Sequence, residues 1–119
     1  MFSAATRTYL FEFNDPLAPP QRELPPGFST GAYHTAEVQY LFRFPVVCAK
    51  TARQERLSVE MMRYWASFAR SGQPGISGQA QWPAFDPQTH RALSLQPGGC
   101  RVITNFAEDH HIQFWQDLP

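Results

Sequence analysis

The chain has little of what would direct it to a nucleic acid or a membrane. Its 119 residues carry ten Lys and Arg against ten Asp and Glu, so the formal net charge is zero. Without a basic stripe to follow a phosphate backbone, we expect no nucleic-acid partner. The only lysine is Lys50, which argues against a polybasic membrane patch. No apolar stretch approaches the roughly 20 residues of a spanning helix, so no membrane partner is expected.

Cysteine is also scarce, with two residues in the chain. Cys48 and Cys100 cannot build a disulfide framework, and their spacing fits no zinc motif. We expect two mostly buried free thiols, with no metal or other cofactor. The first residues show no charged segment followed by an apolar stretch and a cleavage site. This favours a cytoplasmic location if the chain begins at its true N-terminus.

Apolar and aromatic residues are plentiful, at 43% and 14% of the chain. The length allows one domain, or a piece of a larger one. Residues 6–13 (TRTYLFEF) predict a strand, and their nearly unbroken apolar run is typical of a strand covered on both faces in a mostly parallel sheet. We expect no parallel neighbour for it within the chain. The strand should therefore pair with a segment outside these 119 residues.

A long loop and a short helix are expected next. Residues 14–33 contain five prolines, and a loop of this length in a compact domain is usually functional or disordered. The helix that follows His34 is expected to have Thr35 as its N-cap and to end before Pro45. Its predicted apolar face consists of Val38, Leu41 and Phe42.

The clearest predicted helix spans residues 54–70. An apolar stripe at helical spacing runs along it, formed by Leu57, Met61, Trp65 and Phe68 and widened by Met62 and Ala69. Gly72 is placed to cap the helix in the left-handed conformation, and Pro74 prevents its continuation. We interpret this stripe as core packing.

The last third of the chain predicts a hairpin and a final helix. Residues 92–96 and 101–104 flank a Pro-Gly-Gly-Cys turn, as in an antiparallel hairpin. Asn105 and Glu108 resemble a capping box for a helix over residues 106–116.

The four histidines differ in what their positions allow. His90 lies in a polar stretch and is interpreted as a surface residue. His110 and His111 are adjacent, whereas two zinc ligands on one helix are usually four residues apart, so Asp109 beside them does not make a metal site. His34 ends a long stiff loop immediately before a helix, where catalytic groups are common.

Five segments in order resemble the type-B carboxylesterases, the family that includes cholinesterases and para-nitrobenzyl esterases. The histidine segment is residues 31–42 (GAYHTAEVQYLF), and residues 9–13 (YLFEF) resemble the strand before it. Residues 61–74 (MMRYWASFARSGQP) are similar to the family's Trp-x-x-Phe-Ala-Arg-x-Gly-x-Pro helix end. Residues 82–85 (WPAF) and 114–115 (FW) match two later motifs. The resemblance covers nearly the whole chain.

The resemblance implies an α/β fold, specifically the C-terminal piece of an α/β-hydrolase, in which the triad runs Ser, then Asp or Glu, then His. His34 would be the triad general base. Thr35 and Gly75 depart from the family pattern, which usually has Gly or Ala after the histidine and Asn after the helix-ending proline. Glu37 follows the histidine instead of preceding it, so we interpret it as a residue that steadies the loop by hydrogen bonding.

The other parts of an esterase are missing. The nearest imitation of a Gly-x-Ser-x-Gly elbow is residues 75–79 (GISGQ), where the spacing is wrong and Ser77 follows a helix instead of a strand. No glycine-rich oxyanion segment is present. We therefore expect residues 1–119 to be the C-terminal fragment of a carboxylesterase catalytic domain, inactive alone. Its partners would be the upstream N-terminal portion of the same enzyme and a small-molecule ester substrate.

An alternative function belongs to another class. Cholinesterase-like domains of adhesion proteins lack a working triad, so the chain could be a non-catalytic interaction module. A Gly-x-Ser-x-Gly segment on an upstream polypeptide would favour the esterase, and its absence would favour the module.

Overall fold

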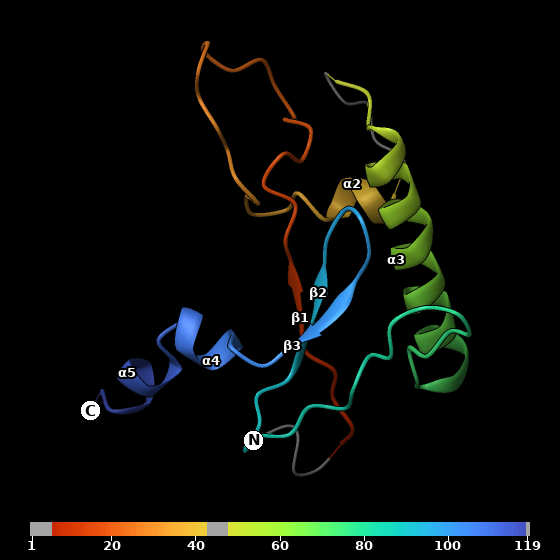
Figure 1. Ribbon diagram of the computed structural model, residues 1–119, viewed down its shortest axis with the longest axis vertical. Coiled ribbons are helices and arrows are strands. Elements are labelled where there is room, and N and C mark those ends of the chain that lie inside the picture. The colour runs from red at the N-terminus through yellow and green to blue at the C-terminus, as the bar shows by residue number, and fades with distance from the viewer. Residues whose placement is uncertain (1–5, 43–47, 119) are drawn as a thin grey trace.

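A computed structural model describes residues 6–42 and 48–118 of the chain. Within them a single sheet has the strand order β1–β2–β3, formed by Phe11–Phe13, Ala92–Leu95 and Arg101–Ile103. The helices are α2 (Val38–Leu41), α3 (Ala52–Ser71), α4 (Phe106–Asp109) and α5 (Ile112–Gln116). The long helix α3 lies along one side of the sheet, and the short helices α4 and α5 lie on the other (Figure 1).

The first strand has a parallel neighbour inside the chain, contrary to the sequence prediction. β1 pairs in parallel with β2, so that Phe11 lies opposite Leu93 and Phe13 opposite Leu95. The predicted hairpin is confirmed, because β2 also pairs antiparallel with β3. The sequence predicts the hairpin without a further strand beside it, whereas its first strand is the centre of the sheet and all four residues of that strand are buried. In the described residues β1 is then an edge strand, with its second edge open.

The regular part of the first strand is shorter than residues 6–13. Before β1, Tyr9 makes only an isolated antiparallel bridge to Ala84. The carbonyl of Leu10 accepts hydrogen bonds from the Leu93 amide at 3.0 Å and from the Trp82 indole at 2.9 Å. This indole bond fixes the extended 82–87 segment against the strand.

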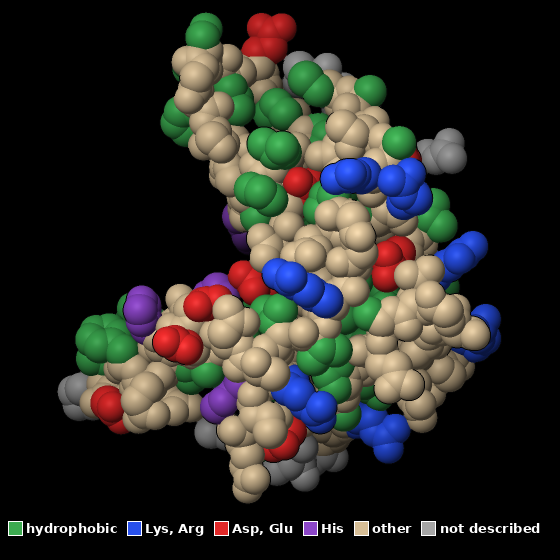
Figure 2. Space-filling model, viewed as in Figure 1, with side chains coloured by type: hydrophobic (Ala, Val, Ile, Leu, Met, Phe, Trp, Pro, Cys, Tyr) green, Lys and Arg blue, Asp and Glu red, His purple; other side chains and the backbone are tan. Residues whose placement is uncertain are grey.

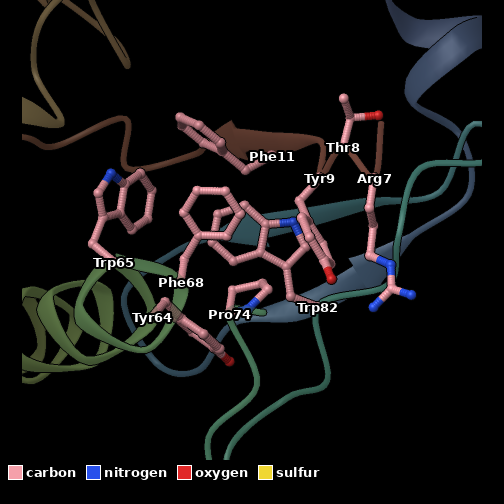
Figure 3. A pocket seen from close by; sticks show the side chains of 9 residues that line it. All are labelled: Arg7, Thr8, Tyr9, Phe11, Tyr64, Trp65, Phe68, Pro74 and Trp82. Atoms are coloured by element: carbon pink, nitrogen blue, oxygen red, sulfur yellow. The ribbon is translucent and has the colours of Figure 1, made fainter. Parts of the chain in front are cut away.

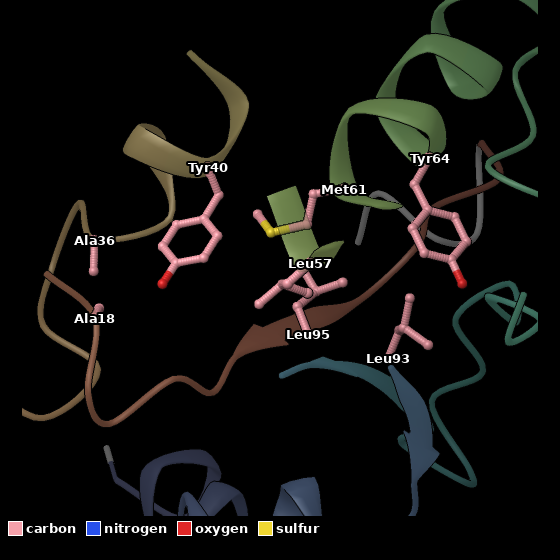
Figure 4. Close-up of a cluster of buried hydrophobic side chains, with 8 residues drawn as sticks. All are labelled: Ala18, Ala36, Tyr40, Leu57, Met61, Tyr64, Leu93 and Leu95. Carbon is pink, nitrogen blue, oxygen red and sulfur yellow. The ribbon is translucent and has the colours of Figure 1, made fainter. Parts of the chain in front are cut away.

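Helix α3 packs its buried residues on the sheet. Thr51 begins the helix with a capping box, because its hydroxyl accepts from the Gln54 amide while the Gln54 side chain accepts from the Thr51 amide. Gly72 ends it at φ 71°, the left-handed cap that the sequence predicts. Figure 4 shows the resulting core, which consists of Ala18, Ala36, Tyr40, Leu57, Met61, Tyr64, Leu93 and Leu95.

The buried stripe of α3 is rotated from the one predicted. Leu57 and Met61 are buried as expected, but Tyr64 completes the stripe in place of Phe68. Phe68 and Met62 are 47% and 44% exposed. Tyr64 can be buried because its hydroxyl donates to the Ala80 carbonyl at 2.6 Å. A purely apolar pattern could not identify that position.

The helix after His34 also differs from the prediction. Its N-cap residue is Glu37, without a side-chain cap, so Thr35 does not cap it. Gln39 and Tyr40 are its buried residues, whereas Phe42 is 62% exposed. Both buried side chains carry polar groups that bond to the proline-rich loop, which explains why an apolar pattern missed them. Pro45 lies outside the described residues.

The final helix is broken in two. His111 has φ 50°, a left-handed conformation that separates α4 from α5. Asn105 makes no cap hydrogen bond, so the predicted capping box is absent. Alternate strand residues point to opposite faces, and Glu12 lies on the face away from the core. There its carboxylate is 3.4 Å from the ring of His110.

The fold is open for a chain of this size. Its accessible surface is 8465 Å², whereas a 13.6 kDa monomer typically exposes about 6,600 Å². The radius of gyration is 15.8 Å, against about 13.5 Å for a compact domain of this length. Apolar side chains remain on the surface (Figure 2), and several large ones are more than half exposed: Leu17, Phe28, Phe42, Phe114 and Trp115. No helix in the described part of the chain is long and apolar enough to cross a membrane.

Candidate active-site histidine and its supporting loop

His34 lies in a turn at the end of the proline-rich loop, directly before α2. It is exposed, and within the described residues its imidazole makes no hydrogen bond. An exposed imidazole without a partner has both ring nitrogens available for proton transfer. The sequence predicted this position at the end of a loop, and the structure agrees with it.

The backbone next to His34 is strained. Thr35 has φ 72°, in the left-handed region that β-branched residues rarely adopt. Such strain persists only where the surroundings determine the conformation, and it is often found at functional sites. The Val38 amide donates to the Thr35 carbonyl at 3.1 Å, which ties this residue to the start of α2.

A first cluster of hydrogen bonds holds the loop at the carbonyl of Pro19. The Tyr33 hydroxyl donates to this carbonyl at 2.8 Å, and the Gln39 amide nitrogen donates to it at 2.9 Å. The same nitrogen also donates to the Tyr33 hydroxyl at 3.0 Å. Burial raises the pKa of Tyr33, although the bond from Gln39 partly opposes this, so the phenol stays a neutral donor. The two side chains precede and follow His34 in sequence.

A second cluster surrounds the carboxylate of Asp15, a residue only 2% exposed. The Tyr40 hydroxyl and the Gln54 amide nitrogen both donate to its Oδ2, and the Leu17 amide donates to its Oδ1 at 3.0 Å. Burial and then the neighbouring Asp15 raise the pKa of Tyr40, which therefore remains protonated. Ser58 on α3 also donates to the Tyr40 carbonyl. No sequence pattern predicted this cluster, although Thr-x-x-Gln at residues 51–54 is a capping-box pattern that places Gln54 in the first turn of α3.

The hydrogen bond predicted for Glu37 is not found among the described residues. Within the part of the chain that the structure describes, its side chain makes no hydrogen bond. Its negative charge only adds to the raised pKa of Tyr33. The loop is steadied by the clusters at Pro19 and Asp15 instead.

The remaining polar candidates lie apart from one another. Ser77 is in a turn after α3, without the strand that a nucleophile elbow requires. His90 is half-buried against the Phe85 ring, with ring centroids 6.0 Å apart, so the predicted surface residue is partly covered. His110 contacts Glu12, and His111 is exposed at the helix break. Among the described residues, no group of three His, Cys, Asp or Glu is placed to hold a metal ion.

The two cysteines are free, as predicted, but they differ in burial. Cys48 is exposed, contrary to the expectation of a buried thiol, whereas Cys100 is half-buried. Burial raises the pKa of Cys100 to about 12, and the nearby Glu60 adds to this shift. Cys100 therefore stays a protonated thiol and is unsuited to act as a nucleophile.

An aromatic pocket lies between the segment before β1 and the C-terminal half of α3 (Figure 3). Its volume is about 290 Å³, and its lining includes Tyr9, Phe11, Trp65, Phe68 and Trp82. Arg7 is the only charged residue of the lining. No residue of the histidine loop lines this pocket, so it is separate from the candidate site.

Solved structures define the fold class. The chain superposes on a PNB esterase with a TM-score of 0.71 and 19% identity, over 93% of this chain and 22% of that one. A thermophilic PNB esterase matches with a TM-score of 0.68 and 18% identity, over 90% of this chain and 22% of the other. The described sheet and helices therefore form part of an α/β-hydrolase fold.

Sequence comparison then identifies the family. Residues 1–115 match the profile of the carboxylesterase family. The chain is 36% identical to human cocaine esterase over 112 residues, which are 91% of this chain and 19% of that protein. It is 31% identical to rat carboxylesterase 1E over 117 residues, which are 97% of this chain and 20% of that protein. The chain belongs to the carboxylesterase family, and it spans about a fifth of the length of these relatives.

Proposed function

We propose that this chain is the C-terminal part of a serine carboxylesterase and contributes the general base His34 to the hydrolysis of carboxylic esters. The observation that carries the proposal is an exposed imidazole, without a hydrogen bond to any described residue, at the end of a loop held on both sides by buried hydrogen bonds. Membership of the carboxylesterase family supports the class of reaction.

In this mechanism His34 moves one proton in each half of the reaction. Its imidazole takes the proton of the serine hydroxyl as the serine oxygen attacks the ester carbonyl, and it gives that proton to the departing alcohol. Water then repeats the sequence on the acyl-enzyme, so that the carboxylic acid leaves and the serine is regenerated. A triad carboxylate would hold the second ring nitrogen.

The serine, the triad acid and the oxyanion donors have to come from another polypeptide segment. We propose that residues 1–119 form an incomplete part of the catalytic domain and that the upstream N-terminal portion of the same enzyme is their partner. The open second edge of β1 and the large exposed surface support this arrangement. The substrate is a small-molecule ester, and the isolated chain is expected to be inactive.

A chimeric enzyme tests the proposal. The chain replaces the matching 112-residue segment of human cocaine esterase, a relative with 36% identity, and hydrolysis of p-nitrophenyl acetate is measured. We expect activity that His34→Gln lowers by at least about a thousandfold, since triad members are worth this much or more. The control is His111→Asn, at an exposed left-handed position that Asn tolerates. It should retain activity.

Three outcomes would contradict the proposal or a part of it. A folded, active chimera that is insensitive to His34→Gln would remove the catalytic role of His34. A folded but inactive chimera would favour a non-catalytic module. Turnover by the purified 119-residue chain, if abolished by His34→Ala, would contradict its expected inactivity.

A further inference from the structure

We propose that Asp15 is a positioning residue for His34, and that its buried carboxylate anchors the histidine segment, residues 31–42, to helix α3. The effect of Asp15 on catalysis rests on the proposed function, in which His34 is the general base. The structural content of the inference, an anchored segment, can be measured independently of activity.

The first argument is the cost of burying this carboxylate. Asp15 is 2% exposed, and it is the only Asp, Glu, Lys or Arg that is buried in the described residues. A buried charge is strongly unfavourable unless hydrogen bonds or an ion pair compensate it. No cation forms an ion pair with Asp15 in residues 6–42 and 48–118. Among these residues, the carboxylate of Asp15 is therefore stabilised by neutral hydrogen-bond donors. Packing alone does not explain why a carboxylate is buried at this position.

The second argument is the identity of those donors. Leu17 belongs to the loop after β1, Tyr40 to α2 and Gln54 to the first turn of α3. The Gln54 amide nitrogen also donates to the Leu17 carbonyl at 2.9 Å. One carboxylate thus joins three segments far apart in sequence. The bond from Tyr40 ties the helix that follows His34 to this carboxylate.

The third argument is the geometry on either side of His34. Tyr33 and Gln39 bind the Pro19 carbonyl, four residues after Asp15, so the same stretch of loop is held from a second direction. Thr35 between these contacts keeps a strained left-handed backbone. The contacts on both sides compensate this strain, and they fix the direction in which the His34 side chain leaves the backbone.

The experiment compares two tyrosines that each lose one buried hydroxyl. Tyr40→Phe removes the bond to Asp15. Tyr64→Phe, in the C-terminal half of α3, removes the bond to the carbonyl of Ala80 in the loop after the helix. Amide hydrogen exchange of the full chain is followed by mass spectrometry. We expect Tyr40→Phe to speed amide exchange in residues 29–41 about tenfold, which corresponds to the free energy of one hydrogen bond. Tyr64→Phe should speed exchange only near residues 74–82.

Variants of Asp15 give a second measurement. Asp15→Ala should loosen residues 29–41 at least as much as Tyr40→Phe does, and Asp15→Asn, which keeps an acceptor oxygen, should restore part of the protection. Equal loosening of residues 29–41 by Tyr40→Phe and Tyr64→Phe, or no loosening by either, would overturn the proposal. So would full protection in a folded Asp15→Ala variant.

Turnover in the chimera separates this inference from the proposed function. Tyr40→Phe should lower kcat several-fold and leave KM nearly unchanged, because the substrate still binds while the base is misplaced. Tyr64→Phe should change neither constant. A loosened histidine segment with unchanged kcat would support the anchoring by Asp15 and contradict His34 as the base.

Discussion

At the scale of single residues, the loop that carries His34 is held by buried polar side chains. Most of their polar atoms have hydrogen-bond partners, although Gln39 Oε1 has none among the described residues. Asp15, Gln39 and Tyr40 are each at most 2% exposed, and each makes a hydrogen bond to a distant part of the chain. Such groups are costly to bury singly and stable as a set. The stiffness of the histidine loop therefore comes from side-chain chemistry, and the five prolines add to it by limiting the backbone.

Thr35→Gly tests the strain beside His34. Glycine adopts φ 72° freely, whereas a left-handed threonine costs roughly 1–2 kcal/mol, partly offset by the flexibility of glycine in the unfolded chain. We expect the free energy of unfolding to rise by about 0.5–1 kcal/mol in urea titration. Thr104→Gly, outside the positive-φ positions, should lower it instead. A loss of stability in Thr35→Gly would show that its side chain contributes more than its backbone costs.

At the scale of elements, α3 is the part that organises the molecule. It carries Leu57, Met61 and Tyr64 to the sheet, and its first turn carries Gln54 to Asp15. The helix has one continuous buried stripe with apolar and polar members. The same face of α3 therefore contacts the sheet through its apolar residues and supports the loop before His34 through Gln54.

Two adjacent methionines test the orientation of this helix. Met61 is fully buried and Met62 is 44% exposed. Met61→Ala should lower the free energy of unfolding by roughly 2–5 kcal/mol because it leaves a cavity between α3 and the sheet. Met62→Ala should change it by less than about 1 kcal/mol. Urea unfolding of both variants measures this difference, and equal losses would mean that the buried stripe is placed wrongly.

At the scale of the whole molecule, the dominant feature is unpaired surface. In the part of the chain that the structure describes, β1 has an open edge, and exposed large apolar side chains occur in the proline-rich loop and in α5. Both features promote association in a free chain. In a complete esterase domain, the same surfaces would be available to the upstream portion of the enzyme.

The isolated chain should therefore fold around its core and still self-associate. Sedimentation velocity at several protein concentrations should show a weight-average mass that rises with concentration, and near-UV circular dichroism should report ordered tryptophans. A monodisperse monomer at every concentration would contradict the expected association. Absence of a near-UV signal would show that the core does not hold without further segments.

Local signals in the sequence were sufficient for several parts of this description. The spacing of apolar residues and the Gly72 cap predicted α3, the Pro-Gly-Gly turn predicted the β2–β3 hairpin, and the ordered motifs identified the family. These features depend on residues close in sequence or on a pattern repeated among relatives. The position of His34 at the end of a loop and before a helix belongs with them.

Long-range pairing was decided only by the tertiary structure. The parallel partner of β1 is about 80 residues away in sequence, and Ala-Leu-Ser-Leu has no composition that marks it as a central strand. Two of the three partners of Asp15 come from α2 and α3, and no local rule connects a turn aspartate with a tyrosine 25 residues later. Local propensity indicates which helix, strand or turn a segment can form by itself. Which buried polar groups satisfy one another depends on how distant segments come together in three dimensions.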